Sequence, residues 1–376
     1  METNLYPCIA TAAFGLEGVV ASELKQLGFG DVKAESGGAR FRADPEGMLL
    51  ANLRLRCADR VQIVLAEAPC QSFEALFQLV GGIPWERLVT PDGQYNISGK
   101  CARSRLMSVR DCQAIAKKAL IERLRAKTHR DRFPETGAAF PIGVSLHSDI
   151  ARITLDTSGT ALNRRGYRTW NGEAPLRETL AAALVALSPW RPGLPLYDPC
   201  CGTGTLLIEA AWRAAHRAPG LTRSFACEAF PAFRSVDIPG MRARLEAETD
   251  LSRIGEIGGS DIDGEALELA GRHVRQAGLD GRIALRQLPL QELQLTAPRG
   301  IFLCNPPYGE RLSDREHCQQ LYGDLRRLQQ RHPGWSLCAI SSDPGFERAY
   351  GKRADKKRRL YNGRLECEFL IFHGKC

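Results

Sequence analysis

The stretch Asp198-Pro199-Cys200-Cys201-Gly202-Thr203-Gly204-Thr205 decides the fold of the second half of this 376-residue chain. It follows a short apolar run and opens an apolar, helix-like segment, Leu206 to Ala215. Glycines let the backbone pass close to a ligand, and a helix N-terminus offers free N–H groups. Leu207 stands where a dinucleotide motif needs a third glycine, and no lysine follows Gly204, which excludes a phosphate-cradling loop. An aspartate at the strand end suits a cationic amino-acid group better than a pyrophosphate, and a purely structural turn is the alternative.

Strand-like and helix-like segments alternate after Pro192-Gly193, which is typical of a doubly wound α/β sheet. The strands expected there are 194–197, 256–260, 283–288, 300–304 and 335–341. A hairpin of 358–361 and 364–372 follows, because Asn362-Gly363 between two apolar-rich runs predicts a type I′ turn. A parallel sheet that ends in an antiparallel hairpin indicates the seven-stranded, Rossmann-like sheet of a class I methyltransferase. A dinucleotide dehydrogenase would instead keep repeating strand–helix units.

Two further strand ends carry polar residues that complete a candidate ligand site. Asp261 ends the second strand, where a carboxylate can accept both hydroxyls of a ribose, while Asp263 is expected to cap the next helix. The fourth strand ends in Asn305-Pro306-Pro307-Tyr308. Two prolines fix the backbone and remove two N–H donors, so carbonyl oxygens remain free to accept hydrogen bonds. Together with the Asn305 oxygen and the flat Tyr308 ring, they predict binding of a planar base that bears an exocyclic amine.

The sequence pattern of the first half of the chain predicts an α+β fold. Its expected strands are 6–10, 32–34, 39–42, 61–66, 94–100, 143–147 and 151–156, and its expected helices are 16–27, 72–79 and 111–126. We expect units at 1–47 and 48–157, a linker and helix at 158–192 that opens at Pro175-Leu176, and the α/β domain at 193–376. The distance along the chain from Gly204 to Asp261 exceeds a plain strand–helix–strand unit. Residues 219–239 are therefore expected to form an inserted loop near the ligand site.

The charges of the chain are clustered. There are 51 basic and 43 acidic residues, a formal net charge of +8, and the cations gather at 100–132, 164–168 and 356–359. Each cluster alone could be a solvated face, but the three together favour contacts with nucleic-acid phosphates. The residues expected to bind RNA are Lys100, Arg103, Arg105, Lys117, Lys118, Arg164, Arg165, Arg168, Lys356, Lys357 and Arg358.

The cysteines point to a reduced compartment. The 13 cysteines form no CxxC pair and are scattered singly, apart from the adjacent Cys200-Cys201, so neither a zinc site nor a disulfide framework is expected. No stretch approaches the ~20 apolar residues that span a bilayer, and the N-terminus lacks the features of a secretory signal. We expect free thiols, no metal, no membrane contact and a cytoplasmic location.

The two motifs that begin at Asp198 and at Asn305, the latter continuing to Leu312, resemble those of the THUMP-domain RNA methyltransferases. Within that family the chain is most similar to the bacterial 23S rRNA guanine-N2 methyltransferases of the RlmL type. The resemblance extends over essentially the whole chain, through the segments Ile9 to Glu17, Leu162 to Arg168 and Ala174 to Ala182. It implies a ferredoxin-like part at 1–47, a THUMP module that holds RNA at 48–157, and a C-terminal domain that binds S-adenosylmethionine.

The resemblance also implies a reaction: methyl transfer to the exocyclic N2 of a guanosine in 23S rRNA or a ribosome precursor. Asn305 and the Pro306 carbonyl, in a motif completed by Pro307, would hold the amine, and Tyr308 would stack on an extruded base. The residues expected at the cofactor are Asp198, Cys200, Gly202, Thr203, Gly204, Thr205, Asp261, Ile262, Asn305 and, from an additional family motif in the preceding helix, Thr179.

The chain departs from the family pattern at two places. Where the family has an acidic residue that meets the adenine after the third strand, this chain has Gln287 and Leu288. Many members continue into a second methyltransferase half, whereas this sequence ends at Cys376, so a 7-methylguanine activity is not expected.

Four other functions compete with this interpretation. A tRNA guanine-N2 methyltransferase is nearest, because the sequence barely separates the two substrates. A DNA adenine-N6 methyltransferase would use the same Asn-Pro-Pro-Tyr motif but usually places a large target-recognition region after it. A protein glutamine methyltransferase would not need three basic clusters. A non-catalytic RNA-binding assembly factor would have no reason to keep Asp198, Gly202, Gly204, Asp261 and Asn305 together.

Overall fold

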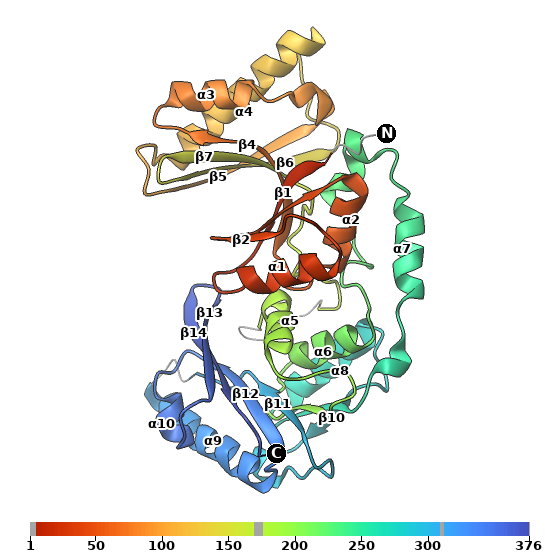
Figure 1. Cartoon of the computed structure of the whole chain (residues 1–376), viewed down its shortest axis with the longest axis vertical. Helices are drawn as coiled ribbons and strands as arrows, with labels where there is room; N and C mark the ends of the chain where they lie inside the picture. The colour runs from red at the N-terminus through yellow and green to blue at the C-terminus, as the bar shows by residue number, and fades with distance from the viewer. Residues whose placement is uncertain (1–4, 169–175, 309–311, 376) are drawn as a thin grey trace. The chain divides into compact units, whose positions relative to one another are not determined.

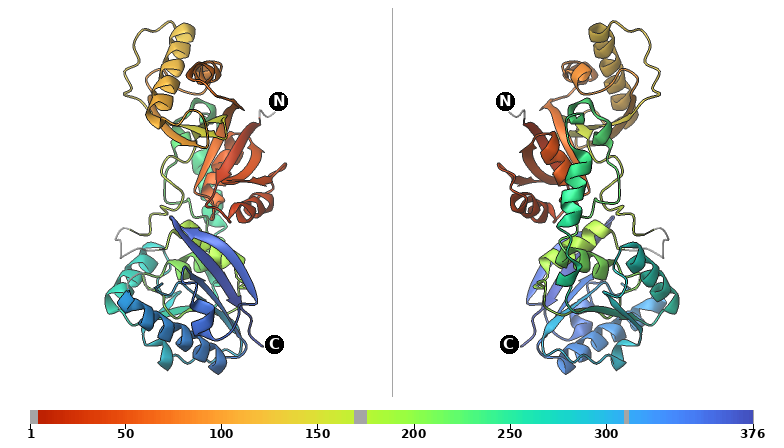
Figure 2. Two further views of the ribbon diagram at one scale, coloured as in Figure 1. Left: turned by 90° about the vertical axis from the view of Figure 1, so that its left-hand side faces the viewer. Right: turned by 90° about the vertical axis from the view of Figure 1, so that its right-hand side faces the viewer.

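The computed structural model describes residues 5–168, 176–308 and 312–375, which form two compact units. Unit 1 comprises residues 1–12, 20–162 and 223–242, and unit 2 comprises residues 13–19, 163–222 and 243–376. Each unit is a twisted sheet with helices packed on it (Figures 1 and 2). The units interleave along the chain, because the segment 223–242 belongs to unit 1 although its neighbours in sequence belong to unit 2.

Unit 1 contains a single seven-stranded sheet of order β2-β3-β1-β4-β7-β6-β5. Only β5 and β6 run parallel, and the other neighbours are antiparallel. Its strands are β1 (Tyr6–Thr11), β2 (Lys33–Glu35), β3 (Gly38–Ala43), β4 (Arg60–Pro69), β5 (Gln94–Ala102), β6 (Ala139–His147) and β7 (Ile150–Asp156). Buried and more exposed residues alternate along β6, so one face of this strand packs into the core.

The helices of unit 1 follow their sequence signals. They are α1 (Glu17–Gln26), α2 (Pro45–Arg54), α3 (Phe73–Gly81), the short 3₁₀ helix η1 (Trp85–Arg87) and α4 (Val109–Thr128). Asp44 caps α2, since its side chain accepts the Gly47 N–H, and Pro45 occupies the first turn. Helices α3 and α4 lie together on one face of the sheet (Figure 1). The boundary expected at residue 47 falls inside α2, and pairing of β1 with β4 makes the sheet continuous across it.

The segment 223–242 belongs to unit 1 and includes most of the insertion expected at residues 219–239, whose place near the ligand site stays a prediction. It carries the 3₁₀ helices η2 (Ala226–Ala229) and η3 (Pro231–Phe233). The Cys227 N–H donates to the Thr157 carbonyl (3.0 Å), and the Phe230 ring stacks on Phe140 with centroids 5.0 Å apart. Buried aromatic rings therefore hold this insertion, and helix α7 (Ile238–Ala247) leads the chain back into unit 2.

Unit 2 contains a seven-stranded sheet of order β10-β9-β8-β11-β12-β14-β13, parallel except for β14, which is antiparallel to both β12 and β13. The strands are β8 (Leu196–Asp198), β9 (Ile257–Asp261), β10 (Ala284–Gln287), β11 (Gly300–Cys304), β12 (Trp335–Ser341), β13 (Lys356–Asn362) and β14 (Leu365–Phe372). The helical segments are α5 (Glu178–Leu187), α6 (Thr205–Ala214), η4 (Leu251–Arg253), α8 (Gly264–Gln276), η5 (Leu290–Glu292), α9 (Leu312–Arg331) and α10 (Phe346–Tyr350). Helix α5 begins later than expected, and Pro175, expected to open it, lies outside the described residues.

Close packing at Gly300 sets the position of β11. A Cβ atom at this glycine would lie 2.6 Å from the Trp335 ring, so only glycine lets the indole lie against the strand. Trp335 also packs against Phe302 (centroids 4.6 Å apart), and its ring N–H donates to the Ala297 carbonyl at 2.8 Å. The strand that ends at Asn305 is thereby fixed in the buried centre of the sheet.

The terminal hairpin is confirmed, but its turn differs from the type I′ turn expected at Asn362-Gly363. Asn362 pairs with Leu365, so Gly363 and Arg364 are the two central residues. Gly363 has φ +66°, whereas Arg364 is not among the described residues with positive φ. One glycine with positive φ at the first central position is the pattern of a type II′ turn.

Candidate active site

The candidate ligand site lies where β8, β9 and β11 end side by side. Parallel pairing aligns Asp198 of β8 with Gly259 of β9, and β11 flanks β8 on the other side. In an open α/β sheet such a crossover point between neighbouring strands leaves a crevice at the carboxyl edge. A cavity of about 480 Å³ opens there, lined by Leu176, Asp198, Cys200, Cys201, Gly202, Thr203, Thr205, Leu206, Asp263, Glu265, Ala266, Leu269 and Asn305.

The loop between β8 and α6 adopts a conformation that requires its glycines. Gly202 and Gly204 have φ +49° and +80°, values that residues with a side chain rarely adopt. The Gly202 N–H donates to Oδ2 of Asp261 at 2.8 Å, and Oδ1 of Asp261 accepts the Asp263 N–H at 3.1 Å. Asp261 therefore ties the glycine loop to the end of β9, in addition to any role toward a ribose.

Asp198 is a deeply buried carboxylate at the end of β8. Only 2 % of the residue is exposed, and Oδ1 accepts the Cys200 N–H at 3.0 Å. Burial raises the pKa of Asp198 well above its ordinary value, and the nearby Asp261 charge raises it further. No described residue forms an ion pair with Asp198. Such a carboxylate favours a ligand that brings a positive charge, as the sequence predicted.

The Asn-Pro-Pro-Tyr segment brings polar groups to the same cavity. Asn305 lines the cavity, and its Oδ1 accepts a hydrogen bond from the Tyr308 hydroxyl. The Tyr322 hydroxyl donates to the Pro307 carbonyl at 2.9 Å. Burial raises the pKa of Tyr308 strongly, so the hydroxyl stays protonated and acts as a donor. Tyr308 thus contacts Asn305 through its hydroxyl, a contact that the expected stacking role does not include.

Of the other residues expected at the cofactor, Gly204, Asp261, Ile262 and Thr179 are not among the described residues that line this cavity. Ile262 is 73 % exposed at the end of β9, an unusual position for a large apolar side chain. Gln287 donates from Nε2 to the Ile262 carbonyl at 3.1 Å, whereas Leu288 packs against the core. Thr179 is buried in the first turn of α5 and is not among the described residues that line the cavity. The sequence analysis missed Leu176 and the α8 face of Ala266 and Leu269.

Arg165 and Arg168, which the sequence analysis assigned to RNA, are turned into unit 2. Arg165 is 2 % exposed and lies 3.5 Å from Glu209 Oε1, which also accepts the Tyr167 hydroxyl at 3.1 Å. Arg168 pairs with Glu178 Oε2 at 3.0 Å and donates to the Leu176 carbonyl at 3.0 Å. Both guanidinium groups form ion pairs inside unit 2 and cannot contact phosphates. The assignment of Arg165 and Arg168 to RNA binding is therefore corrected.

Arg168 instead shapes the cavity, because two of its partners line it. Its Nη1 lies within 3.5 Å of the Thr205 hydroxyl as well as contacting Leu176. The ion pair with Glu178 anchors the guanidinium to α5, and Asn163 Nδ2 donates to the same carboxylate at 3.4 Å. One buried cation therefore joins the walls contributed by Leu176 and Thr205. The sequence did contain a signal for this arrangement: Glu178 is an acidic residue in the first turn of the otherwise apolar helix α5, and a buried acid needs a cationic partner.

The other basic residues expected to bind RNA differ in whether an acidic side chain of the protein already pairs with them. Lys117 pairs with Glu135 (2.7 Å), Lys118 contacts Glu122 (3.8 Å), and Lys357 pairs with Glu347. Arg358 donates to the Gly15 carbonyl at 2.7 and 3.1 Å. Arg164 is exposed. Lys100, Arg103, Arg105 and Lys356, which are also expected to bind RNA, are exposed and form no ion pair within the described residues.

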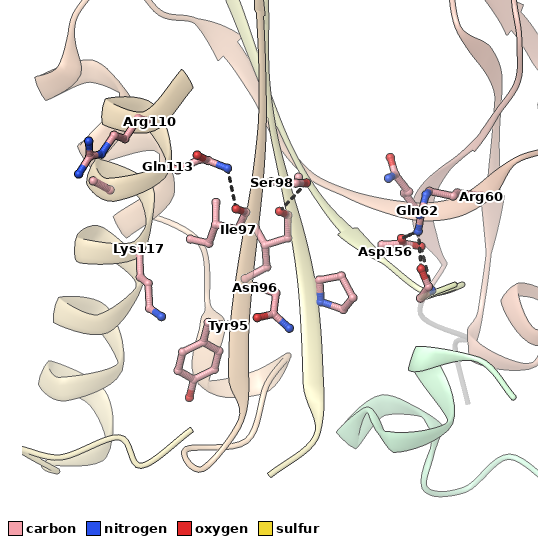
Figure 3. A pocket seen from close by; sticks show the side chains of 15 residues that line it. Arg60, Gln62, Tyr95, Asn96, Ile97, Ser98, Arg110, Gln113, Lys117 and Asp156 are labelled. Carbon is pink, nitrogen blue, oxygen red and sulfur yellow. Dashed lines mark hydrogen bonds and ion pairs between the residues drawn. The ribbon is translucent and has the colours of Figure 1, made fainter. Parts of the chain in front are cut away.

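A second cavity, of about 730 Å³, lies in unit 1 beside β5 and α4. Figure 3 shows Arg110, Gln113 and Lys117 on α4 at one side, and Arg60, Gln62 and Asp156 across the sheet. Arg60 is bonded to Asp156 and to the Gly159 carbonyl, and Gln113 donates to the Ile97 carbonyl at 2.9 Å. Arg60 and Lys117 thus already pair with acidic residues, so this cavity has less unpaired positive charge than its three cationic side chains would indicate.

Other kinds of site are scarce in the described part of the chain. Within residues 5–168, 176–308 and 312–375, no three potential metal ligands gather in one place. No helix among them combines the length and apolar composition that a bilayer crossing requires.

The strand order, the glycine loop and the Asn-Pro-Pro-Tyr segment at adjacent strand ends define unit 2 as a class I methyltransferase. A family model described as the RMKL-like methyltransferase domain matches residues 165–371. Models of the RlmL ferredoxin-like domain and of the THUMP domain match residues 7–62 and 70–156. The chain belongs to the RMKL-like family of RNA methyltransferases.

Relatives match along the whole chain. "Putative RNA methyltransferase YpsC" of Bacillus subtilis is 37 % identical over 98 % of this chain and 96 % of its own length. "Ribosomal RNA large subunit methyltransferase K/L" of Syntrophotalea carbinolica is 35 % identical over 96 % of this chain, which spans 53 % of that longer protein.

Two solved structures share the fold closely. "SMU.472, a putative methyltransferase complexed with SAH" is 38 % identical with a TM-score of 0.94, and the match covers 100 % of both chains. A "predicted N6-adenine-specific DNA methylase" of Listeria monocytogenes is 40 % identical with a TM-score of 0.94, over 99 % of this chain and 97 % of that one. S-adenosylmethionine is the methyl donor of the family. Two features fit this donor: the buried carboxylate of Asp198, which pairs with no described cation, and the exposed side chain of Ile262 at the end of β9.

The first prediction concerns Asp198→Asn, which keeps an oxygen for the Cys200 N–H but removes the charge. Because the pKa of Asp198 is raised, the folded protein holds a proton there more tightly than the unfolded chain does. The stability that this proton provides is lost as the pH rises from the ordinary aspartate pKa to the raised pKa. Without ligand, the variant should unfold at a higher temperature than wild type at pH 8, by roughly 2–4 °C per kcal/mol gained, and the difference should shrink toward pH 4. Its affinity for S-adenosylhomocysteine should fall about tenfold or more, because a hydrogen bond to a charged group is lost.

Thermal unfolding across pH and calorimetric titration measure both effects. Asp156→Asn is the matched control, since Asp156 is also buried but is paired with Arg60, and its replacement should destabilise the protein. If Asp198→Asn binds S-adenosylhomocysteine as tightly as wild type does, Asp198 does not contact the ligand.

The second prediction concerns Arg168→Ala. It removes the donors to Leu176 and Glu178, so the KM for S-adenosylmethionine should rise about tenfold while kcat at saturation changes little. Arg242→Ala breaks a comparable half-buried pair with Glu228 in unit 1 and should lower stability alone. Weaker RNA binding with an unchanged KM for the donor would instead return Arg168 to the RNA-binding residues.

Proposed function

We propose that this protein methylates the exocyclic N2 of a guanosine in 23S rRNA, as the free RNA or within a ribosome precursor, with S-adenosylmethionine as donor. The observation that carries the proposal is that Asn305 lines the same cavity as Asp198 and the glycine loop. An acceptor for amine N–H groups and a carboxylate for a cation therefore share one site. The K/L relative is named for ribosomal RNA of the large subunit, and the THUMP match supports an RNA substrate.

The chain supplies groups for each part of the donor. Asp198 would hold the positively charged amino group, which relieves the cost of its burial. Asp261 has further lone pairs on both carboxylate oxygens and would accept the ribose hydroxyls while keeping Gly202 in place. Ile262 would lie against the adenine ring, with Gln287 beside it in place of the acidic residue usual in the family.

The reaction depends on positioning more than on a strong base. Bound S-adenosylmethionine supplies a methyl group on a positively charged sulfur. The guanine N2 lone pair is delocalised into the ring, so the amine is a poor nucleophile until its geometry changes. Asn305 Oδ1 and the Pro306 carbonyl would accept its two N–H bonds and aim the lone pair away from the ring plane. The proton can then leave to solvent, because methylation makes the nitrogen acidic.

Tyr308 would hold Asn305 in this orientation. Its hydroxyl donates to Oδ1, and that oxygen has a second lone pair for the substrate N–H. The ring of Tyr308 would stack on a base extruded from its helix once the base has entered. Each of these contacts keeps the amine in a fixed place relative to the donor.

An N6-adenine activity is the second candidate, because the Listeria structure carries that description and adenine also presents an exocyclic amine. A tRNA guanosine is the third. Labelled S-adenosylmethionine with protein-free 23S rRNA, bulk tRNA and duplex DNA, followed by digestion to nucleosides, separates them. N2-methylguanosine from 23S rRNA alone is the expected result.

Our third prediction is that Asn305→Ala abolishes this product. Loss of one polar contact that acts in the transition state should cost about 2–4 kcal/mol, or roughly 30- to 1000-fold in rate. Affinity for S-adenosylhomocysteine and the unfolding temperature serve as controls and should change little. Label that appears as N6-methyladenine would overturn the proposed base, and label in tRNA would change the substrate but not the mechanism.

The fourth prediction separates the hydroxyl of Tyr308 from its ring. Tyr308→Phe keeps the ring and loses the bond to Asn305, so kcat should fall about 3–10-fold with an unchanged KM for RNA. Tyr308→Ala should also raise the KM for RNA. Tyr322→Phe, which removes the bond to the Pro307 carbonyl, is the matched control. Wild-type kcat in Tyr308→Phe would show that the hydroxyl does not orient Asn305.

A further inference from the structure

Helix α8 packs against the glycine loop of unit 2 through a buried histidine. Its buried residues are Ala270, His273 and Val274, whose spacing of three and four residues places them on one face of the helix. The side chain of His273 is fully buried, and its Nδ1 lies 3.1 Å from the Thr203 carbonyl oxygen. Because a carbonyl oxygen can only accept, the proton of this hydrogen bond is on Nδ1. The histidine therefore donates from the helix to the loop that follows β8.

Two hydrogen bonds hold the peptide group between Thr203 and Gly204. Its carbonyl accepts from His273, and its N–H donates to the Cys201 carbonyl at 2.8 Å. In a trans peptide the carbonyl and the N–H point to opposite sides, so this group cannot rotate without breaking these bonds. Gly204 also lies close to α8, since a Cβ atom added to it would be 3.3 Å from the Ala270 Cβ. The end of the glycine loop is thus fixed directly against the helix.

The same loop and the same helix form part of the cavity wall. Thr203 and Thr205, the two neighbours of Gly204, line the cavity, and so do Ala266 and Leu269 of α8. A rotation of the peptide group between residues 203 and 204 would move the two threonines relative to the helix. The shape of this wall therefore depends on the hydrogen bond from the histidine.

We propose that His273 is a positioning residue for the methyl donor, because it holds the glycine loop in the conformation that binds S-adenosylmethionine. It would act through the Thr203 carbonyl, since His273 is not among the described residues that line the cavity. The bond from Gly202 to Asp261 fixes the beginning of the loop, and the bond from His273 fixes its end. The proposal rests on the donor site of the proposed function and is independent of the RNA substrate.

This role predicts a particular change in kinetics. Without the hydrogen bond, the loop would spend part of its time in other conformations, and the apparent affinity of a ligand falls in proportion to the fraction that can bind it. The bound donor selects the binding conformation, so the reacting groups are arranged as in wild type once the donor is saturating. The KM for the donor should therefore change without a change in kcat.

His273→Leu removes the hydrogen-bond donor and keeps a buried side chain. Its affinity for S-adenosylhomocysteine, measured by calorimetric titration, should fall about tenfold, as expected for a loop that holds the binding conformation about one tenth of the time. The KM for S-adenosylmethionine should rise by the same factor, and kcat should stay within about twofold of wild type. In the ligand-free variant, the Gly204 N–H should exchange with deuterium faster than in wild type, because the peptide group is released on one side.

Two further variants of His273 test the hydrogen bond itself. The amide nitrogen of asparagine is bonded to Cγ, as Nδ1 of histidine is, so His273→Asn can donate to the Thr203 carbonyl and should restore most of the affinity. His273→Gln carries its amide one bond further from the backbone and should restore little of it. If His273→Leu does not fold, the comparison of the asparagine and glutamine variants decides.

Trp212→Phe is the matched structural control. The ring N–H of Trp212 donates to the Ala277 carbonyl at the other end of α8 (3.0 Å), away from the glycine loop. Loss of this bond should lower the unfolding temperature and leave the affinity for S-adenosylhomocysteine unchanged. A change in affinity equal to that of His273→Leu would show that any weakening of α8 has this effect, which would overturn the specific role of the histidine.

Other outcomes also decide the proposal. It is wrong if His273→Leu binds S-adenosylhomocysteine as tightly as wild type, or if the asparagine variant is folded and binds no better than the glutamine variant. Wild type that binds S-adenosylhomocysteine but forms no N2-methylguanosine would reject the proposed reaction alone, because the binding measurements still establish the role of His273. Wild type that does not bind S-adenosylhomocysteine would overturn the proposed donor site and this proposal together.

Discussion

The carboxylate of Asp261 joins the two loops on which the ligand site depends. One oxygen accepts the N–H of Gly202, in the loop after β8, and the other accepts the N–H of Asp263, in the loop after β9. This is possible because Asp198, the last residue of β8, lies opposite Gly259, so that β9 continues two residues further to Asp261, beside the loop after β8. A Cβ atom at Gly259 would lie 2.6 Å from Leu207 and 2.8 Å from Cys201. The shape of the cavity is therefore set by the register of the sheet, and the side chains that line it depend on that register.

Local signals in the sequence predicted the α/β half well. The bounds of β11 and β12 agree with the prediction, because both are continuous apolar runs buried in a parallel sheet. The continuous sheet of unit 1 could not be predicted, since pairing of β1 with β4 joins residues some fifty positions apart in sequence. Helix α2 was missed although Asp44-Pro45 is a clear start signal. The packing of 223–242 within unit 1 was not predicted, because its aromatic contacts to Phe140 leave no local pattern.

The arginines show why a cluster of like charges does not by itself indicate a surface. In the sequence, 164–168 and 100–105 look alike, yet Arg165 and Arg168 face inward and Arg103 and Arg105 face solvent. The difference lies in distant acids: Glu178 and Glu209 occur in the apolar helices α5 and α6 and must be paired when buried. An acidic residue inside an apolar helical run is thus a signal that a cation elsewhere in the chain turns inward. This signal was present in the sequence and was not used.

The same reasoning distinguishes the buried acids that form ion pairs from Asp198, which we propose holds the ligand. Asp156 is buried beside Arg60, and Glu178 and Glu209 lie against Arg168 and Arg165. Asp198 is buried as deeply, but among the described residues it accepts only the Cys200 N–H, and it lies near a second negative charge at Asp261. Burying an unpaired carboxylate costs stability, and packing cannot recover that free energy. If the amino group of the donor binds Asp198 as proposed, it recovers this free energy, and the destabilising charge at this strand end then contributes to the binding energy of the ligand.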